Sequence, residues 1–175
     1  TGNYVSDMSD AAGTSWLDCG AREWSPDLLS KSGLRQDQVP DLFEGSVPIG
    51  NLRSELTERW GVGRNVIVVG GGGDNAAAAC GVGALREGDA FVSLGTSGVL
   101  LAAKDSFAPM PASAVHTFCH AVPNRWYQMG VILAATDSLN WLSQILDADA
   151  ADLAGIVGTS INGPNDMQFC LLYTS

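Results

Sequence analysis

The sequence predicts an α/β protein, because strand-like and helix-like patterns follow one another along it. Residues 65–69 are an apolar run rich in β-branched side chains, which is typical of a buried strand. Glycines occupy the next four positions, and an alanine-rich stretch from Asp74 to Val82 then predicts a helix that packs closely on its neighbours. Strand, glycine turn and helix in this order indicate a fold that mixes helices with a sheet.

Three further helices are expected along the chain. Residues 25–33 begin with a Ser-Pro pair, in which the serine hydroxyl caps free N–H groups, and they end with a glycine. Residues 51–60 carry Leu and Trp side chains at four-residue spacing and precede Gly61, so they predict an amphipathic helix. Residues 131–146 are long enough for a helix, with leucine and isoleucine side chains on one face.

The remaining patterns predict short strands and loops. The strand-like runs are residues 15–18, 90–94, 99–103, 117–122 and 126–129. The tight turn Gly95–Gly98 joins the second and third of these runs, and its glycines predict positive φ angles. Residues 36–48 contain two prolines and are expected to form a loop.

Charge and composition exclude several classes of protein. The chain has a formal net charge of −10 and no cluster of Lys or Arg, so a nucleic acid is not an expected partner. It has no apolar run of about 18 residues and no basic-then-apolar leader, so neither membrane insertion nor export is expected. The four cysteines, at 19, 80, 119 and 170, form no Cys-x-x-Cys pair, which favours reduced thiols. We therefore expect a cytoplasmic, globular protein.

The first candidate site is the glycine-rich turn from Gly70 to Asn75. Glycines allow a backbone to approach a ligand closely, and the helix that follows presents free N–H groups. An aspartate at this point, Asp74, could accept a proton from a hydroxyl that attacks phosphorus, and Asn75 could hold that hydroxyl or its neighbour. The alternative is an ordinary glycine turn in which Asp74 only caps the helix.

The second candidate site is the stretch Ser93–Gly98. A turn rich in Gly, Thr and Ser exposes backbone N–H groups and hydroxyls, which suit phosphate oxygens because these are acceptors only. An ordinary hairpin turn would explain the same residues. The stretch has no Gly-Lys-Ser/Thr, so it is not a P-loop.

A third group, His116, Cys119 and His120, contains residue types that bind metals. In a strand, however, adjacent side chains point to opposite faces, so Cys119 and His120 would diverge, and the sequence offers no obvious fourth ligand. We therefore expect these residues to be structural, and we expect no protein-built metal site.

The order of motifs resembles the FGGY family of carbohydrate kinases. Five blocks agree in order and spacing: residues 9–14, 42–45, 71–75, 93–99 and 115–120. The resemblance extends from about Tyr4 to about Leu146. It implies an actin-like (ribonuclease H-like) fold, of which this chain holds part, with ATP and a sugar bound between two α/β domains. The implied reaction requires Mg²⁺ and transfers the γ-phosphate of ATP to the terminal hydroxyl of a ketopentose. The ketopentose that the resemblance favours is D-xylulose.

The resemblance also implies roles for particular residues. Asp74 would be the catalytic base and, with Asn75, a sugar contact. The second phosphate loop would consist of Gly95, Thr96, Ser97 and Gly98. Residues 1–87 would be the C-terminal part of the sugar-binding domain, and residues 88–160 the start of the ATP-binding domain.

Several departures from the family pattern define further expectations. The chain contains neither an Asp-x-Gly-Thr phosphate loop nor a Gly-Gly-Gly-Ala adenosine segment, so we expect an internal fragment that is inactive alone. Residues 161–175 do not continue the pattern and are expected to be a truncated or artefactual tail. The alternatives are a kinase for ribulose, gluconate or glycerol, and a non-catalytic actin-like sugar-binding domain, which retention of Asp74 disfavours. A homodimer is a possible assembly of the full-length enzyme.

Overall fold

The computed structural model describes residues 1–157 and 163, and its contacts divide the chain into two compact units. Unit 1 comprises Thr1–Phe91 and Leu101–Met129. Unit 2 comprises Val92–Leu100 and the residues from Gly130 onward. Apart from Gly163, the expected tail at 161–175 lies outside the described residues. The expected domain division between residues 87 and 88 stays a prediction.

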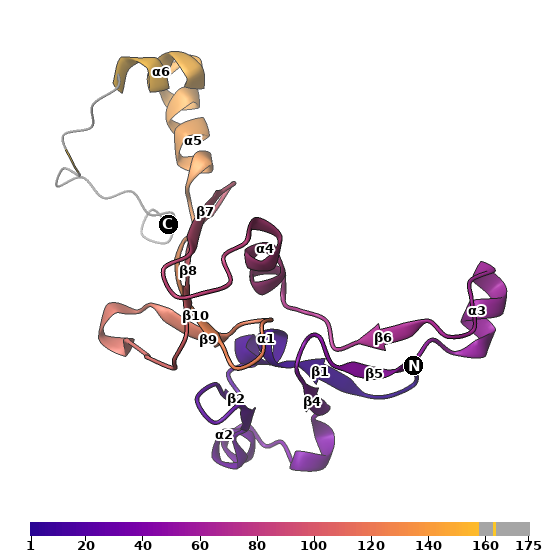
Figure 1. The fold of residues 1–175 in the computed structure, drawn as a ribbon. Helices are drawn as coiled ribbons and strands as arrows, with labels where there is room; N and C mark the ends of the chain where they lie inside the picture. Colours follow the sequence, from indigo (N-terminus) through magenta and orange to yellow (C-terminus); the bar gives the residue numbers. More distant parts are fainter. Residues whose placement is uncertain (158–162, 164–175) are drawn as a thin grey trace. The chain divides into compact units, whose positions relative to one another are not determined.

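Unit 1 contains short helices and three two-stranded sheets (Figure 1). Its helices are α1 (Met8–Ala11), α2 (Pro26–Lys31), α3 (Ser54–Trp60) and α4 (Asp74–Val82). Its paired strands are β1 (Val5–Asp7) with β4 (Asp41–Phe43), β2 (Leu17–Asp18) with β3 (Glu23–Trp24), and β5 (Pro48–Asn51) with β6 (Ile67–Val69). The first pair is parallel and the other two are antiparallel.

A four-stranded sheet has the order β7-β8-β10-β9. Its strands are β7 (Ala90–Leu94), β8 (Gly98–Lys104), β9 (His116–Cys119) and β10 (Trp126–Ile132). Within unit 1, β9 and β10 are antiparallel, with Trp126 opposite Cys119 and Met129 opposite His116. Unit 2 also contains α5 (Thr136–Leu146) and α6 (Ala150–Val157). The expected hairpin of residues 117–122 and 126–129 is confirmed, although β9 ends at Cys119 and the chain then turns.

The core of unit 1 lies where α1, α2, β2, β3 and β9 meet. Its buried members are Ala11, Ala12, Leu17, Trp24, Leu29 and Cys119. Leu29 on α2 is almost fully buried, and burying such a side chain contributes about 1.5–3 kcal/mol. The small side chains of Ala11 and Ala12 let α1 approach β9 closely. This packing also fixes the start of α1, which contains Ser9.

The helix boundaries that depend on local chemistry are confirmed. Ser25 caps α2, since its Oγ accepts a hydrogen bond of 3.3 Å from the Leu28 N–H, and Gly33 beyond the helix has a φ of 73°. Gly61 ends α3 with a φ of 64°. The alanine-rich helix spans Asp74–Val82 as expected, and its Ala76 and Ala79 are buried. Each of these helix ends is thus determined by residues next to it in the sequence.

Three expectations are wrong because tertiary pairing decides the outcome. The expected loop at 36–48 contains β4, which exists because it pairs with β1 more than thirty residues earlier in the sequence. The strand at 65–69 is not buried: Ile67 is 61% exposed, since β6 pairs along one edge with β5 and no helix of unit 1 covers it. The expected helix at 131–146 starts only at Thr136, because β10 extends to Ile132 within the sheet.

Within the described part of the chain, no helix combines the length and the apolar character that crossing a membrane requires.

Candidate active site

The glycine turn between β6 and α4 is packed against another backbone of unit 1. Gly70 N–H donates to the Val47 carbonyl (3.1 Å) and Gly71 N–H donates to the Gly45 carbonyl (3.0 Å). A Cβ added to Gly70 would lie 2.7 Å from the Glu44 carbonyl oxygen, and one on Gly45 would lie 2.3 Å from the Gly71 oxygen. The sequence predicts that these glycines leave room for a ligand, but at Gly45 and Gly70 they make room for a neighbouring chain segment.

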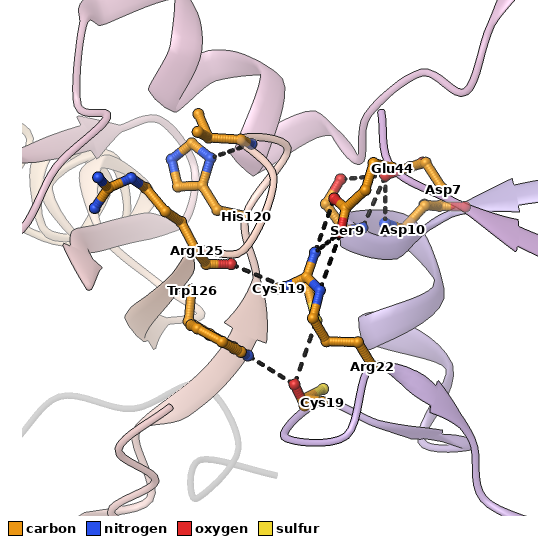
Figure 2. Close-up of polar contacts among 11 residues, drawn as sticks. Asp7, Ser9, Asp10, Cys19, Arg22, Glu44, Cys119, His120, Arg125 and Trp126 are labelled. Atoms are coloured by element: carbon orange, nitrogen blue, oxygen red, sulfur yellow. Dashed lines mark hydrogen bonds and ion pairs between the residues drawn. The ribbon is translucent and has the colours of Figure 1, made fainter. Parts of the chain in front are cut away.

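The end of the glycine turn is held by a hydrogen-bond relay, of which Figure 2 shows the buried part between Ser9 and Asp7. The Gly73 N–H donates to Ser9 Oγ at 2.9 Å, and the Ser9 hydroxyl donates to Asp7 Oδ2 at 2.5 Å. The same Asp7 oxygen accepts from the backbone N–H groups of Ser9 (2.8 Å) and Asp10 (3.2 Å), so Asp7 also caps α1. Asp7 and Ser9 are each only 4% exposed. The relay therefore fixes the residue immediately before Asp74.

Asp74 is the first residue of α4, and its side chain is exposed. Its Oδ1 accepts from the Asn75 backbone N–H (2.7 Å) and from Asn75 Nδ2 (3.1 Å). Its Oδ2 makes no hydrogen bond or ion pair with another described residue. A carboxylate is favourable here because the helix N-terminus carries partial positive charge. One oxygen is thus anchored while the other can receive a proton.

Tyr127 on β10 lies within the electrostatic reach of Asp74. Burial raises the pKa of the Tyr127 phenol, and the negative charge of Asp74 raises it further. The tyrosine side chain is nearly inaccessible to solvent. Because its pKa is raised, its hydroxyl stays neutral near pH 7.

The second candidate loop, Gly95–Gly98, lies in unit 2. The Gly95 N–H donates to the Ser97 carbonyl at 2.8 Å, which closes the turn. Neither loop glycine has positive φ, so that expectation is wrong. Gly98 is needed for a different reason, because a Cβ there would lie 2.8 Å from Ile132 Cγ1. Thr96 and Ser97 are exposed, and neither hydroxyl bonds to another described residue.

Hydrogen bonds from the start of α5 hold this loop in place. Ala135 N–H donates to the Thr96 carbonyl (2.7 Å), and Thr136 N–H donates to the Gly95 carbonyl (3.0 Å). Thr136 Oγ1 also donates to the Gly95 carbonyl at 2.6 Å. The loop carbonyls are therefore occupied, while its hydroxyls are left for a ligand that accepts hydrogen bonds. Asp74 and Asn75 lie in unit 1, so the two candidate loops belong to different units.

An ion pair fixes the segment on which the glycine turn rests (Figure 2). Arg22 Nη2 donates to both carboxylate oxygens of Glu44, at 2.8 and 2.9 Å, and Arg22 Nε donates to Oε1 at 3.1 Å. Arg22 Nη1 donates to the Arg125 carbonyl at 3.1 Å, and the guanidinium lies over the Trp126 ring, 5.3 Å from its centroid. Glu44 thereby holds the backbone that Gly70 and Gly71 contact.

The histidines and cysteine of the third candidate group form no metal site. His120 is fully buried, and its ring accepts from the Val122 N–H at Nδ1 (3.0 Å) while Nε2 lies 3.0 Å from the Ala84 carbonyl. This pattern requires a neutral ring protonated at Nε2, and burial lowers the His120 pKa accordingly. Within the described residues, no group of three or more His, Cys, Asp or Glu side chains could hold a metal. The structural interpretation is confirmed for His120.

The sequence interpretation missed Asp7, Ser9 and Thr136 as site residues. An Asp one residue before a helix is a recognisable cap, so Asp7 carried a local signal. Nothing local indicates that Ser9 contacts Gly73, because 64 residues separate them.

Comparison with known proteins relates this chain to one family of enzymes. The model of the FGGY family of carbohydrate kinases, N-terminal domain, matches residues 1–81. By this match residues 1–81 belong to the FGGY family of carbohydrate kinases, and the chain's α/β architecture is part of the actin-like fold of these sugar kinases. The implied fold is thus confirmed.

The similar proteins include xylulose kinases. The chain is 50% identical over 145 residues to the xylulose kinase of Escherichia coli (strain K12), which covers 83% of the chain and 30% of that protein. The crystal structure of a xyloylose kinase from Brucella ovis is 56% identical, with a TM-score of 0.87, over 94% of this chain and 34% of that one. A gluconate kinase from Lactobacillus acidophilus, 22% identical with a TM-score of 0.81 over 92% of this chain and 33% of that one, shows the fold alone. The chain thus spans about a third of the length of these relatives.

Proposed function

We propose that this chain contributes the catalytic base and one phosphate-binding loop to an ATP-dependent kinase that phosphorylates D-xylulose at its terminal hydroxyl. The xylulose kinase of E. coli, at 50% identity, supports the sugar and the reaction. The match to that enzyme covers 83% of this chain. Both candidate loops lie within the residues that resemble the FGGY pattern.

The observation that carries the proposal is the state of the Asp74 carboxylate. It lies at the start of α4, exposed, with one oxygen bound by Asn75 and the other without a described partner. Such a carboxylate can accept the proton of a sugar hydroxyl as that oxygen attacks the γ-phosphorus. Asn75 orients the carboxylate and, as proposed, contacts the sugar. Phosphoryl transfer depends mainly on positioning, so the relay behind Gly73 matters as much as basicity.

The Gly95–Gly98 loop is proposed to hold phosphate oxygens of ATP. The hydroxyls of Thr96 and Ser97 are exposed donors, whereas phosphate oxygens are acceptors, so the two sets of groups fit. Bound Mg²⁺ would neutralise charge on the phosphates.

Location and assembly are part of the same proposal. A cytoplasmic location fits the use of ATP and the described cysteines, none of which forms a disulfide. A homodimer of the full-length enzyme stays a prediction.

The test is a substrate comparison with the full gene product that carries this chain. Release of ADP is measured with D-xylulose, ribulose, gluconate and glycerol, and the phosphorylated product is identified by mass spectrometry. We expect the highest kcat/KM with D-xylulose. A preference for another substrate would identify another kinase of the family, and sugar binding without turnover on any substrate would identify a non-catalytic binding protein. The isolated 175 residues are expected to be inactive, and ATP-dependent turnover by them would contradict that expectation.

A further inference from the structure

Two cysteines of unit 1 that have no part in the proposed kinase chemistry lie together. Cys19 follows β2 in a turn, and Cys119 ends β9, one hundred residues later. Cys119 Sγ lies 3.6 Å from the Cys19 carbonyl oxygen, so the two cysteines are in contact. Both side chains pack in the core that α1, α2 and β9 share.

The surroundings of the pair hold it in place. Trp126 Nε1 donates to the Cys19 carbonyl oxygen at 2.6 Å, so the same carbonyl faces the indole and the Cys119 sulfur (Figure 2). Trp126 is opposite Cys119 in the β9–β10 ladder, and Arg22 lies over its ring. The Trp126 indole thus holds the Cys19 backbone beside Cys119.

The two thiols differ in access and in acidity. Cys119 is fully buried, whereas Cys19 is partly exposed. Hydrogen bonding with Cys119 lowers the pKa of Cys19, burial and the negative charge of Asp18 oppose this, and the positive charge of Arg22 makes the smallest lowering contribution. The hydrogen bond with Cys19, followed by burial, raises the pKa of Cys119. An accessible, more acidic thiol beside a buried one is the arrangement of a reactive cysteine with its resolving partner.

We propose that Cys19 and Cys119 form a redox-active dithiol that a peroxide oxidises to an intrachain disulfide. The Cys19 thiolate attacks one peroxide oxygen and becomes a sulfenic acid as the O–O bond breaks and hydroxide, or the corresponding alkoxide, leaves. The Cys119 sulfur then attacks the Cys19 sulfur, the S–O bond breaks, and the Cys119 proton leaves with the oxygen as water. With hydrogen peroxide, two thiols and one peroxide thus give one disulfide and two waters.

The described residues around the two cysteines do not form a metal-binding group. Within residues 1–157 and 163, no third His, Cys, Asp or Glu completes a metal-binding group with the two thiols. Cys80 on α4 is exposed and belongs to no such pair, so the chain supplies its own control for the reactivity of an isolated thiol. Burial alone raises the Cys80 pKa.

The test is peptide mapping of the full gene product after a graded dose of hydrogen peroxide. Remaining thiols are blocked in acid, and the protein is cut with trypsin without reduction. Cleavage after Lys and Arg puts the three cysteines on separate peptides, which end at Arg22, cover residues 65–86 and cover residues 105–125. We expect the first and third peptides to become linked at doses that leave most of Cys80 as free thiol.

Two single variants test the order of the steps. In Cys119→Ser, a sulfenic acid on Cys19 should accumulate and react with dimedone, whereas in Cys19→Ser the peptide 105–125 should remain unlabelled. In the unaltered protein, recovery of both thiols at doses that already oxidise Cys80 would overturn the proposal. So would a cross-link that forms equally fast in urea, because the folded arrangement would then contribute nothing.

Discussion

The relay from Asp7 through Ser9 to Gly73 makes a quantitative prediction for Ser9→Ala. The substitution removes the 2.5 Å hydrogen bond to a buried carboxylate and leaves the Gly73 N–H without its acceptor. A hydrogen bond to a charged group contributes about 1.5–3 kcal/mol, and an unsatisfied buried donor costs about 1–3 kcal/mol. Because Gly73 is only half-buried and can recruit water, we expect the free energy of unfolding to fall by about 2–4 kcal/mol.

Urea unfolding and calorimetry measure this change. A loss of that size lowers the Tm of a domain near this length by roughly 4–16 °C. Ser6→Ala is the matched control, since it removes a hydroxyl from the same segment whose only described hydrogen bond, to the Asp7 carbonyl, is long at 3.4 Å. The control should lose less than about 1 kcal/mol.

A local measurement separates the relay from a general loss of packing. Amide hydrogen exchange of a peptide spanning residues 70–77 should rise in Ser9→Ala at urea concentrations well below the unfolding transition. Exchange at α2, which the relay does not contact, should change little under the same conditions. If Ser9→Ala matched Ser6→Ala in both stability and exchange, the relay would not hold the start of α4 and the reasoning would be refuted.

Two further predictions concern Gly70 and His120. Gly70→Ala places a Cβ 2.7 Å from the Glu44 carbonyl oxygen, so the backbone must shift. The free energy of unfolding should fall by about 1–3 kcal/mol. An unchanged midpoint of urea unfolding would contradict the packing described for this turn. Burial lowers the pKa of His120 below its unfolded value of about 6.5, so its contribution to stability is complete above that pH and is lost as the pH falls through the folded pKa. His120→Gln should therefore flatten the stability profile between about pH 7 and 5, as measured by urea unfolding across that range, and an unchanged slope would contradict the buried neutral ring.

The parts of the fold that local chemistry determines were predictable from the sequence. A serine cap, a proline in the first turn and a glycine after the last turn define α2, and alanine content defines α4. The strand β4 was not predictable in the same way, because it depends on β1. Exposure of β6 was also unpredictable, since a β-branched run indicates a strand but not what covers its faces.

The candidate site was predictable as a set of residues but not as an arrangement. The turn before Asp74 and the hydroxyls of Thr96 and Ser97 follow from motif chemistry. The reasons for the glycines do not, because Gly70 and Gly98 are required by backbone and side-chain neighbours distant in sequence. The supports at Ser9 and Thr136 are long-range hydrogen bonds, and such pairings leave no periodic or compositional signal.

The most direct test of the central proposal is turnover by Asp74→Asn in the full gene product, with D-xylulose binding measured on the same preparation by calorimetry. Losing a general base should reduce kcat by about 10²–10⁴-fold, while the Kd for the sugar changes little because asparagine keeps the shape and hydrogen bonding of the side chain. Asp27→Asn is the matched control, since Asp27 is also an exposed carboxylate in the first turn of a helix and pairs only with Lys31. Near-normal turnover by Asp74→Asn would contradict the role proposed for Asp74.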